Sequence, residues 1–529
     1  MNRREFMKTP VEGALVSGLA KNQTARSAQR ASDPQPNIIL IMADQVTPFM
    51  LAPYGQTVAR TPALSFLART GTVFDAAYCA SPLCVPSRMC LATGRLAHKI
   101  QAYDNASELP THLPSFVGYL RGAGYRTIAS GKCHFIGPDQ LHGFDERLTP
   151  DIFPADFSML PDWRLGPVFN QGTSIGEMLR MLGPSKWTPQ LGFDQMTFDR
   201  AIARLREYAI GNHEGQPFFL KVSFTEPHDP FTTTRHFLDL YKNADIPLPK
   251  DYGSILKLSP TYEWFIIHHG INRVKLSPAR IREARRNYLG MISWVDDRIG
   301  KLLAEMQRLG IDKNTVIIFT SDHGEMLGEH GQWSKRLMLE WSIRVPLIVS
   351  APGLLPEGRR VAAPVSLIDL FPTLAELAGA KVETAVDGRS LLGLLKGEES
   401  GGERAVVAEY LGEGTIEPVR MIRRENYKYI TVNGYPPQLF DLSADPHETV
   451  NAAGRAEYAQ AERRLRELAE KDWDGPALKR AVIENQEERR VVWRSTHQHG
   501  QPPHWDFQPV EKGVYDPRSD FTVRCCDSP

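Results

Sequence analysis

The sequence predicts an α/β fold, with a mainly parallel sheet sandwiched by helices and a small C-terminal antiparallel α+β subdomain. Continuous apolar runs at residues 37–42 (NIILIM) and 315–321 (TVIIFTS) are typical of strands buried on both faces. Stretches with the 3.6-residue spacing of amphipathic helices lie between such runs, the longest at residues 278–309. Strands that alternate with helices favour a parallel sheet with helices on both faces.

The remaining elements follow the same two patterns along the chain. Residues 37–385 carry the alternation and form the main α/β domain, and the Gly-, Glu- and Ser-rich segment at about 385–405 reads as a linker. Short strand-like pieces and a charged helix over 405–475 predict the subdomain, and residues 476–529 form a C-terminal extension. Further strands are expected at 127–130, 218–225 and 346–350, and further helices at 63–70, 113–123, 194–209 and 369–378.

The composition excludes several classes of protein. The chain has 529 residues, of which 42% are hydrophobic and 23% charged, as in ordinary globular proteins. It is therefore neither collagen-like nor wholly disordered. Lys and Arg number 62, as do Asp and Glu, so the balanced charge gives no support for a nucleic-acid partner. Six cysteines are too few for a disulfide framework in so long a chain.

Residues 1–36 look like a targeting segment and linker. Arg3 and Arg4, followed by Phe6 and a weakly apolar stretch, resemble a twin-arginine export signal. Glu12 inside that stretch, and the lack of a clean A-x-A cleavage site, favour the alternative of a disordered arm. We expect export to the periplasm, with a cytoplasmic protein as the alternative.

Polar residues gather where the predicted strands end. Asp44 follows the first strand, and Asp322 and His323 follow the strand at 315–321. Lys132 with His134, and His228, follow two others. One such strand end is explained by a simple turn, since Asp and Gly favour turns. Four together predict one shared ligand site, because ligands bind outside the carboxyl ends of strands in open α/β sheets.

The sharpest local motif is Cys84-Val85-Pro86-Ser87-Arg88. Pro86 is favoured in a first helical turn, so Cys84 is expected at a helix N-terminus, a position that attracts anions. Arg88 lies four residues on, on roughly the same face, and its guanidinium suits an oxyanion. The alternative for an isolated motif of this kind is a buried free cysteine beside a structural arginine.

This motif resembles the C-x-P-S-R signature of sulfatases, in the alkaline phosphatase superfamily. Residues 124–134 resemble a second sulfatase signature, and Asp44, residues 322–324 and residues 439–446 match in order. The resemblance spans roughly residues 36–510. It implies that a formylglycine-generating enzyme oxidises Cys84 to formylglycine, whose hydrate attacks the sulfur of a small-molecule sulfate ester and then expels sulfate.

The resemblance also implies a metal site and a set of catalytic residues. Asp44, the modified Cys84, Asp322 and His323 would hold one divalent cation; oxygen ligands suit Ca²⁺, and a histidine ligand would suit Mn²⁺. Lys132 and Lys335 would contact the sulfate. His134 would be the partner of the formylglycine hydroxyl, and His228 would donate to the leaving oxygen. With Arg88, these residues would stabilise the transferring sulfuryl group.

Several stretches resemble choline sulfatases more than arylsulfatases, namely residues 103–106, 137–144, 151–157, 224–230 and 505–509. This resemblance places Asn105, Met159, Phe169 and Glu409 in the substrate site, with Glu409 opposite a quaternary ammonium. Met159 stands where these enzymes have a Trp, so another organic sulfate is the alternative substrate. The superfamily also contains phosphodiesterases and phosphonate monoester hydrolases, so a phosphodiester or phosphonate monoester is a further alternative. The C-terminal extension implies a homo-oligomer.

Overall fold

The computed structural model describes residues 35–211, 215–251, 255–498 and 504–509. The predicted export signal lies outside the described residues, apart from Gln35 and Pro36 at its end. The described residues from Pro36 onward group into one compact unit, which contains the predicted main domain and subdomain.

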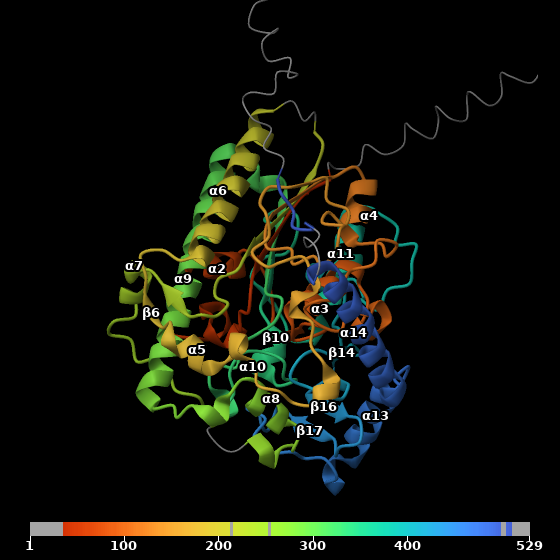
Figure 1. Cartoon of the computed structure of the whole chain (residues 1–529). Coiled ribbons are helices and arrows are strands. Elements are labelled where there is room, and N and C mark those ends of the chain that lie inside the picture. Colours follow the sequence, from red (N-terminus) through yellow and green to blue (C-terminus); the bar gives the residue numbers. More distant parts are fainter. Residues whose placement is uncertain (1–34, 212–214, 252–254, 499–503, 510–529) are drawn as a thin grey trace, which may run out of the picture. The chain divides into compact units, whose positions relative to one another are not determined.

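A mainly parallel eight-stranded sheet forms the centre of the main domain (Figure 1). The strand order is β12-β2-β11-β9-β1-β7-β4-β5, and β11 alone among these runs antiparallel to its neighbours. The strands are β1 (Asn37–Ala43), β2 (Gly71–Phe74), β4 (Arg126–Gly131), β5 (Glu146–Arg147), β7 (Phe218–Phe224), β9 (Thr315–Thr320), β11 (Leu347–Ser350) and β12 (Arg359–Val361). The predicted fold class is confirmed.

Helices cover both faces of this sheet because both faces are apolar. Ile38 and Leu40 of β1 belong to one core cluster, and Ile39 and Ile41 belong to the other, as the alternation of side chains along a strand requires. The two helical layers flank the sheet in Figure 1. One layer holds α2 (Pro62–Arg69), α6 (Pro189–Ile210) and α9 (Pro278–Leu309), and the other holds α3 (Cys84–Thr93), α4 (Phe116–Gly122) and α11 (Leu370–Leu377).

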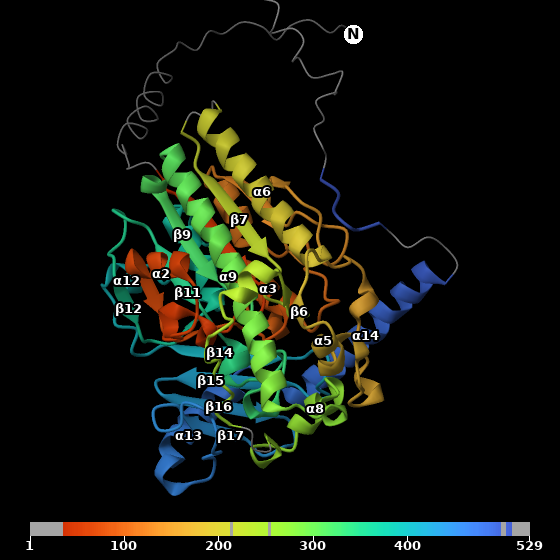
Figure 2. The same ribbon diagram turned by 90° about the vertical axis from the view of Figure 1, so that its left-hand side faces the viewer.

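The C-terminal subdomain is a four-stranded antiparallel sheet, as Figure 2 shows. Lys428 is buried where the subdomain meets the main domain, and its ammonium donates to Glu340 at 2.9 Å and to Glu448 at 2.7 Å. Helix α13 packs on two of the strands. The elements are β14 (Ala405–Tyr410), β15 (Val419–Arg424), β16 (Tyr427–Val432), β17 (Gln438–Asp441) and α13 (Ala459–Glu470).

The segment at 385–405 and the C-terminal extension both contain helices that pack on the rest of the protein. The segment at 385–405 is not simply an exposed linker, because it contains α12 (Leu392–Lys396) and buries Leu391 and Leu395 in the core. The C-terminal extension begins with α14 (Gly475–His497), and Gln486 on this helix accepts a hydrogen bond from the Trp163 backbone at 3.0 Å. The expected homo-oligomer stays a prediction. None of the helices that the structure describes has the length and apolarity to span a bilayer.

The smaller elements connect these layers and complete the site loops. The two minor sheets are β10-β3-β13 and β6-β8, formed by β3 (Ala77–Tyr78), β6 (Gly183–Pro184), β8 (Thr232–Thr233), β10 (Arg344–Val345) and β13 (Val365–Ser366), and the short helices are α5 (Ile175–Arg180), α7 (Arg235–Asp239), α8 (Tyr262–His268) and α10 (Glu340–Ile343).

Candidate active site

The predicted strand-end residues meet at the carboxyl edge of the central strands. Asp44 follows β1, Asp322 follows β9 and Lys132 follows β4, and these three strands belong to the consecutive run β9-β1-β7-β4 of the sheet. Asp44 and Asp322 are both fully buried. Parallel strands therefore bring together residues that are more than 250 positions apart in the chain.

Cys84 reaches this cluster from the other side, as the first residue of α3. Leu83 before it is extended, with φ −153° and ψ 143°, and the helix begins at Cys84 as predicted. The side chain of Asn105 caps the helix, because its Oδ1 accepts from the Val85 N–H at 3.1 Å. Asn105, predicted to bind substrate, thus holds the backbone beside Cys84 in this structure.

Four side chains at this point could hold a metal ion. Asp44, Cys84, Asp322 and His323 each offer one ligand atom, and these atoms lie within 4.8 Å of one another. The Nε2 of His323 is 3.1 Å from the Cys84 Sγ, 3.6 Å from Asp44 Oδ1 and 3.8 Å from Asp322 Oδ1. The other ring nitrogen, Nδ1, lies 3.1 Å from the Gly324 carbonyl, which leaves Nε2 for a ligand.

These separations fit a single divalent cation. Ligands about 2.3 Å from a metal lie about 3.3 Å apart when adjacent and about 4.6 Å apart when opposite in an octahedron. Burial lowers the pKa of His323, so its imidazole is neutral, as a ligand must be. Two carboxylates and an oxygen on a modified Cys84 suit Ca²⁺, and the imidazole adds a preference for Mn²⁺.

Arg88 orients the two carboxylates. Its Nε donates to Asp322 Oδ2 at 2.8 Å, and its Nη2 lies 3.6 Å from Asp44 Oδ2. Burial would raise the pKa of Asp44, but Lys132, His228 and Arg88 together hold it well below its usual value. Burial would likewise raise the pKa of Asp322, and chiefly Arg88 holds it low. Both carboxylates are therefore ionised and ready to bind a cation.

Lysines 132 and 335 enter the cluster from two sides. The Lys132 ammonium donates to Asp44 Oδ2. The Lys335 ammonium donates to Gln45 Oε1 and lies 2.6 Å from His228 Nε2. His228 Nδ1 lies 2.7 Å from the Asp229 carbonyl oxygen, and because that oxygen can only accept, Nδ1 is the donor of this hydrogen bond. The predicted Lys132, Lys335 and His228 therefore lie in one connected site.

His134 differs from these residues because neither ring nitrogen has a hydrogen-bond partner among the described residues. The ring is buried, and burial together with the charge of Lys132 holds its pKa well below the usual value. A neutral imidazole with both nitrogens free can accept a proton from, or donate one to, a bound group. An imidazole in this state could pair with a hydroxyl, which is the role predicted for His134, and that role stays a prediction.

The predicted substrate-binding side chains lie less directly in this cluster. The carboxylate of Glu409 is fully buried, accepts from the His98 N–H at 3.0 Å and lies 3.6 Å from Arg420 Nε. The Phe169 ring is covered by the Arg273 guanidinium at 3.8 Å. Met159 is half-buried at the end of a short helix. Their roles in binding substrate stay predictions.

Sequence reasoning missed two residues that the structure brings to the site. Gln45, which follows Asp44, donates from Nε2 to Asp229 at 3.0 Å and to Glu325, and its Oε1 accepts from the Lys335 ammonium. Glu413 accepts from Arg336 Nη2 at 2.8 Å, while its other oxygen is buried without a hydrogen-bond partner among the described residues. The proximity of Glu413 to Glu409 in sequence was the only available signal for it.

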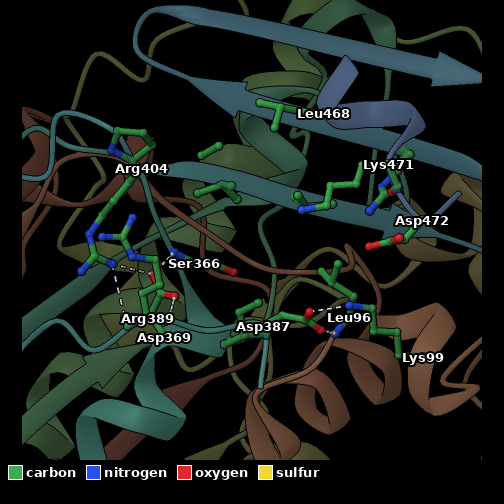
Figure 3. Close-up of a pocket in the computed structure, with 16 residues that line it drawn as sticks. Leu96, Lys99, Ser366, Asp369, Asp387, Arg389, Arg404, Leu468, Lys471 and Asp472 are labelled. Carbon is green, nitrogen blue, oxygen red and sulfur yellow. Dashed lines mark hydrogen bonds and ion pairs between the residues drawn. The ribbon is translucent and has the colours of Figure 1, made fainter. Parts of the chain in front are cut away.

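A cavity of about 240 Å³ lies away from this cluster, between the main domain and the C-terminal sheet (Figure 3). Asp369 and Asp387 in its wall accept hydrogen bonds from backbone amides, including that of Leu96 at 2.9 Å. Its described lining residues include none of the predicted site residues. The catalytic interpretation therefore concerns the strand-end cluster and not this cavity.

Comparison with known proteins agrees with this geometry. The family model described as Sulfatase matches residues 36–380, and that described as N-sulphoglucosamine sulphohydrolase, C-terminal, matches residues 328–473. A choline-sulfatase from Rhizobium meliloti (strain 1021) is 36% identical over 90% of this chain and 94% of its own length. An arylsulfatase K from Gallus gallus is 28% identical over 84% of this chain and 83% of its own.

Solved structures show the same fold. BT4656, in complex with its substrate D-glucosamine-2-N,6-O-disulfate, has a TM-score of 0.66 and 25% identity, covering 84% of this chain and 98% of that one. A phosphonate monoester hydrolase from Silicibacter pomeroyi has a TM-score of 0.67 and 22% identity, covering 89% of this chain and 100% of that one. The family model, the 36% identical relative and the strand-end site agree, and this chain belongs to the sulfatase family.

Proposed function

We propose that this sulfatase hydrolyses a small cationic alcohol sulfate, with choline-O-sulfate as its substrate, through a formylglycine at position 84. The observation that carries the proposal is the placement of Cys84 at the start of α3, within 4.8 Å of three further metal-ligating side chains. Oxidation of this thiol by a formylglycine-generating enzyme would place a hydroxyl where Sγ now lies. A divalent cation held there would polarise the sulfate and acidify that hydroxyl.

The protein's own cations would bind and orient the sulfuryl group. The Lys132 ammonium donates to Asp44, the Lys335 ammonium donates to Gln45, and the Arg88 guanidinium lies 3.6 Å from Asp44. Pre-placed cations of this kind stabilise charge that develops on transferring oxygens without reorganising. His228 is about one-fifth exposed, so it lies toward the solvent side, where a departing alcohol would leave.

The choline assignment is supported by the relative that is 36% identical and by an acidic residue near the site. Arg336 donates its backbone N–H to the Pro82 carbonyl at 3.1 Å, which places Arg336 and its partner Glu413 beside the loop before Cys84. The Glu413 oxygen that has no hydrogen-bond partner among the described residues is a candidate contact for a quaternary ammonium, whereas the carboxylate of Glu409 already has His98 and Arg420. Glu413 therefore joins Glu409 as a candidate countercharge.

Turnover of choline-O-sulfate, an aryl sulfate, a phosphodiester and a phosphonate monoester by the modified enzyme tests this proposal. Choline-O-sulfate should have the highest kcat/KM. Glu413→Gln should raise the KM for choline-O-sulfate and leave the neutral aryl sulfate nearly unchanged, because only choline carries a charge to neutralise. Glu409→Gln is the matched comparison that decides between the two carboxylates.

The choline proposal would be abandoned if both variants lost the two sulfate esters equally, or if a fully modified enzyme left choline-O-sulfate intact. Preference for a phosphodiester or phosphonate monoester would redirect the assignment to another hydrolase activity. A peptide mass that shows Cys84 unmodified in the native host would leave an anion-binding protein instead.

We also propose export to the periplasm as a folded protein. Arg3 and Arg4 support this proposal, since paired arginines before an apolar stretch are typical of twin-arginine signals. Replacing both by Lys should retain the enzyme in the cytoplasm, measured by fractionation of the native host. Export that survives the double replacement would contradict the proposal.

A further inference from the structure

The orientation of His134 requires an explanation, because its ring makes no hydrogen bond of its own with the described residues. Its backbone has φ 57°, in the left-handed region that a residue with a Cβ seldom adopts. Two contacts hold the residue in place. Its N–H donates to Asp151 Oδ2 at 2.8 Å, and its ring stacks on Phe153 with centroids 4.7 Å apart and planes at 16°. Residues 151–153 thus fix both the backbone and the ring of His134.

Asp151 holds the turn after β4 through several hydrogen bonds to one carboxylate oxygen. Its Oδ2 also accepts from the Cys133 N–H at 3.0 Å and from Arg147 Nη2 at 2.9 Å. Burial would raise the pKa of Asp151, but Arg147 and His134 hold it below the usual value, so the carboxylate is ionised. An ionised acceptor with three donors on one oxygen anchors the turn after β4 more strongly than a neutral one would.

Phe153 extends the same anchor to other catalytic groups. The Lys132 ammonium lies 4.3 Å from the centre of its ring, and the His228 ring lies 6.0 Å away. A single ring therefore contacts or borders Lys132, His134 and His228. Phe153 is itself partly exposed, whereas His134 beneath it is buried.

The Arg147 guanidinium, which pairs with Asp151, is itself held by neighbouring aromatic rings. The Arg147 guanidinium lies 4.8 Å from the Phe507 ring and 5.8 Å from the Phe135 ring, so aromatic side chains hold the cation that pairs with Asp151. Asp506, next to Phe507, accepts from the Ala155 N–H at 2.9 Å. The described part of the C-terminal extension thus packs on the segment that holds His134.

We propose that Asp151 is a positioning residue that acts through His134, and that Phe153 sets the plane of the His134 ring. The inference rests on the proposed function, because the orientation of His134 affects turnover only if His134 meets the reacting group. Displacement of a catalytic group by about 1 Å can cost about 100-fold in rate. Loss of the anchor should therefore lower kcat and spare KM.

The experiment compares Asp151→Ala, Asp151→Asn and Phe153→Leu in the modified enzyme, each alone and combined with His134→Ala, using 4-nitrophenyl sulfate. Asp151→Ala should lower kcat about 10- to 100-fold with KM changed less than about 3-fold. Asp151→Asn keeps an acceptor oxygen and should recover part of that loss. In the His134→Ala background each further substitution should cost less than about 3-fold, because the residue through which it acts is gone.

Asp145→Asn is the matched control. Asp145 likewise accepts from a backbone amide, that of Thr127 at 2.9 Å, but Thr127 lies at the start of β4, at the opposite end of the strand from His134. It should leave kcat near the wild-type value. An equal loss in Asp145→Asn, or a loss from Asp151 substitution that persists in full without His134, would mean that Asp151 only stabilises the fold and would overturn the inference.

Hydrogen exchange supplies a readout that does not depend on turnover. A peptide spanning residues 130–136 should lose amide protection in Asp151→Ala, or in Asp151→Asn if the alanine variant does not fold, and keep it in Asp145→Asn. Unchanged protection in the Asp151 variants would refute the anchor. A wild-type enzyme that turned over no sulfate ester would count against the proposed function instead, and the exchange result would still decide this inference.

Discussion

Arg88 offers a test that separates its catalytic contribution from its contribution to stability. Its guanidinium makes three hydrogen bonds, to Asp322 Oδ2 at 2.8 Å, to the Lys132 carbonyl at 2.9 Å and to Ser223 Oγ at 3.0 Å. Lys at this position keeps the charge but reaches one of these partners at most. Two buried acceptors then lose their donor, at about 1–3 kcal/mol each, so Arg88→Lys should destabilise the protein by about 4 kcal/mol.

Arg285→Lys is the matched control for this change. Arg285 is similarly buried, and its guanidinium donates to the Leu327 carbonyl at 2.9 Å, the Pro247 carbonyl at 3.0 Å and Glu329 at 2.8 Å, among other contacts. Its loss should therefore cost a similar amount. For a chain of roughly 500 residues the unfolding entropy is about 1 kcal/mol per K, so each variant should lower Tm by about 4 °C.

The two variants should differ in metal binding. Arg88 holds the Asp322 carboxylate by its Oδ2 atom, which leaves Oδ1 for a metal ion. Arg88→Lys should therefore weaken Mn²⁺ or Ca²⁺ binding about 10- to 100-fold and lower turnover in proportion. Arg285→Lys should bind metal as the wild type does. Calorimetric titration of the metal-free proteins, with scanning calorimetry for Tm, measures both effects. Wild-type metal affinity in Arg88→Lys, or no loss of Tm in either variant, would refute the reasoning.

Three further outcomes follow from the site and the core. Cys84→Ala should remain folded by circular dichroism and lose nearly all turnover; multiple turnover at the wild-type rate would refute the formylglycine hypothesis. Chelation should inactivate the enzyme, and Asp322→Ala should bind no metal by elemental analysis, so a stoichiometric ion in that variant would remove Asp322 from the site. Burial lowers the pKa of Lys221 to about 8, so between about pH 8 and its higher unfolded pKa the unfolded chain binds more protons and stability rises with pH. Lys221→Met should therefore raise Tm at pH 7, where the cost of the buried charge is fully present. The gain should shrink between about pH 8 and about pH 10 and stay small above that range, and a gain independent of pH would contradict this account.

The fold was largely predictable because its signals are local. A continuous apolar run such as β1 needs no partner to be recognised as a buried strand, and the 3.6-residue spacing over Pro278–Leu309 identified α9 to its ends. The direction of β11 was not predictable, because a short apolar strand has the same sequence pattern whether its neighbours run parallel or antiparallel to it. The segment at 385–405 was read as a linker for a related reason: it is rich in glycine and charge, but it also contains four buried leucines, Leu391, Leu392, Leu394 and Leu395.

The sequence by itself determined where the candidate site residues stand, since Cys84, Asp44 and Asp322 lie at a helix start and at strand ends that the local pattern already specifies. Only the tertiary structure decided how those residues are held. Asp151 reaches His134 from 17 positions away through a turn, and Gln45 reaches Lys335 across 290 positions through neighbouring strands. Such contacts depend on which strands become neighbours and on side-chain direction, and neither follows from spacing along the chain. The same limit applies to Glu409 and Glu413: both stand in one short stretch of sequence, but their different neighbours in space leave only Glu413 with an unpartnered oxygen among the residues described.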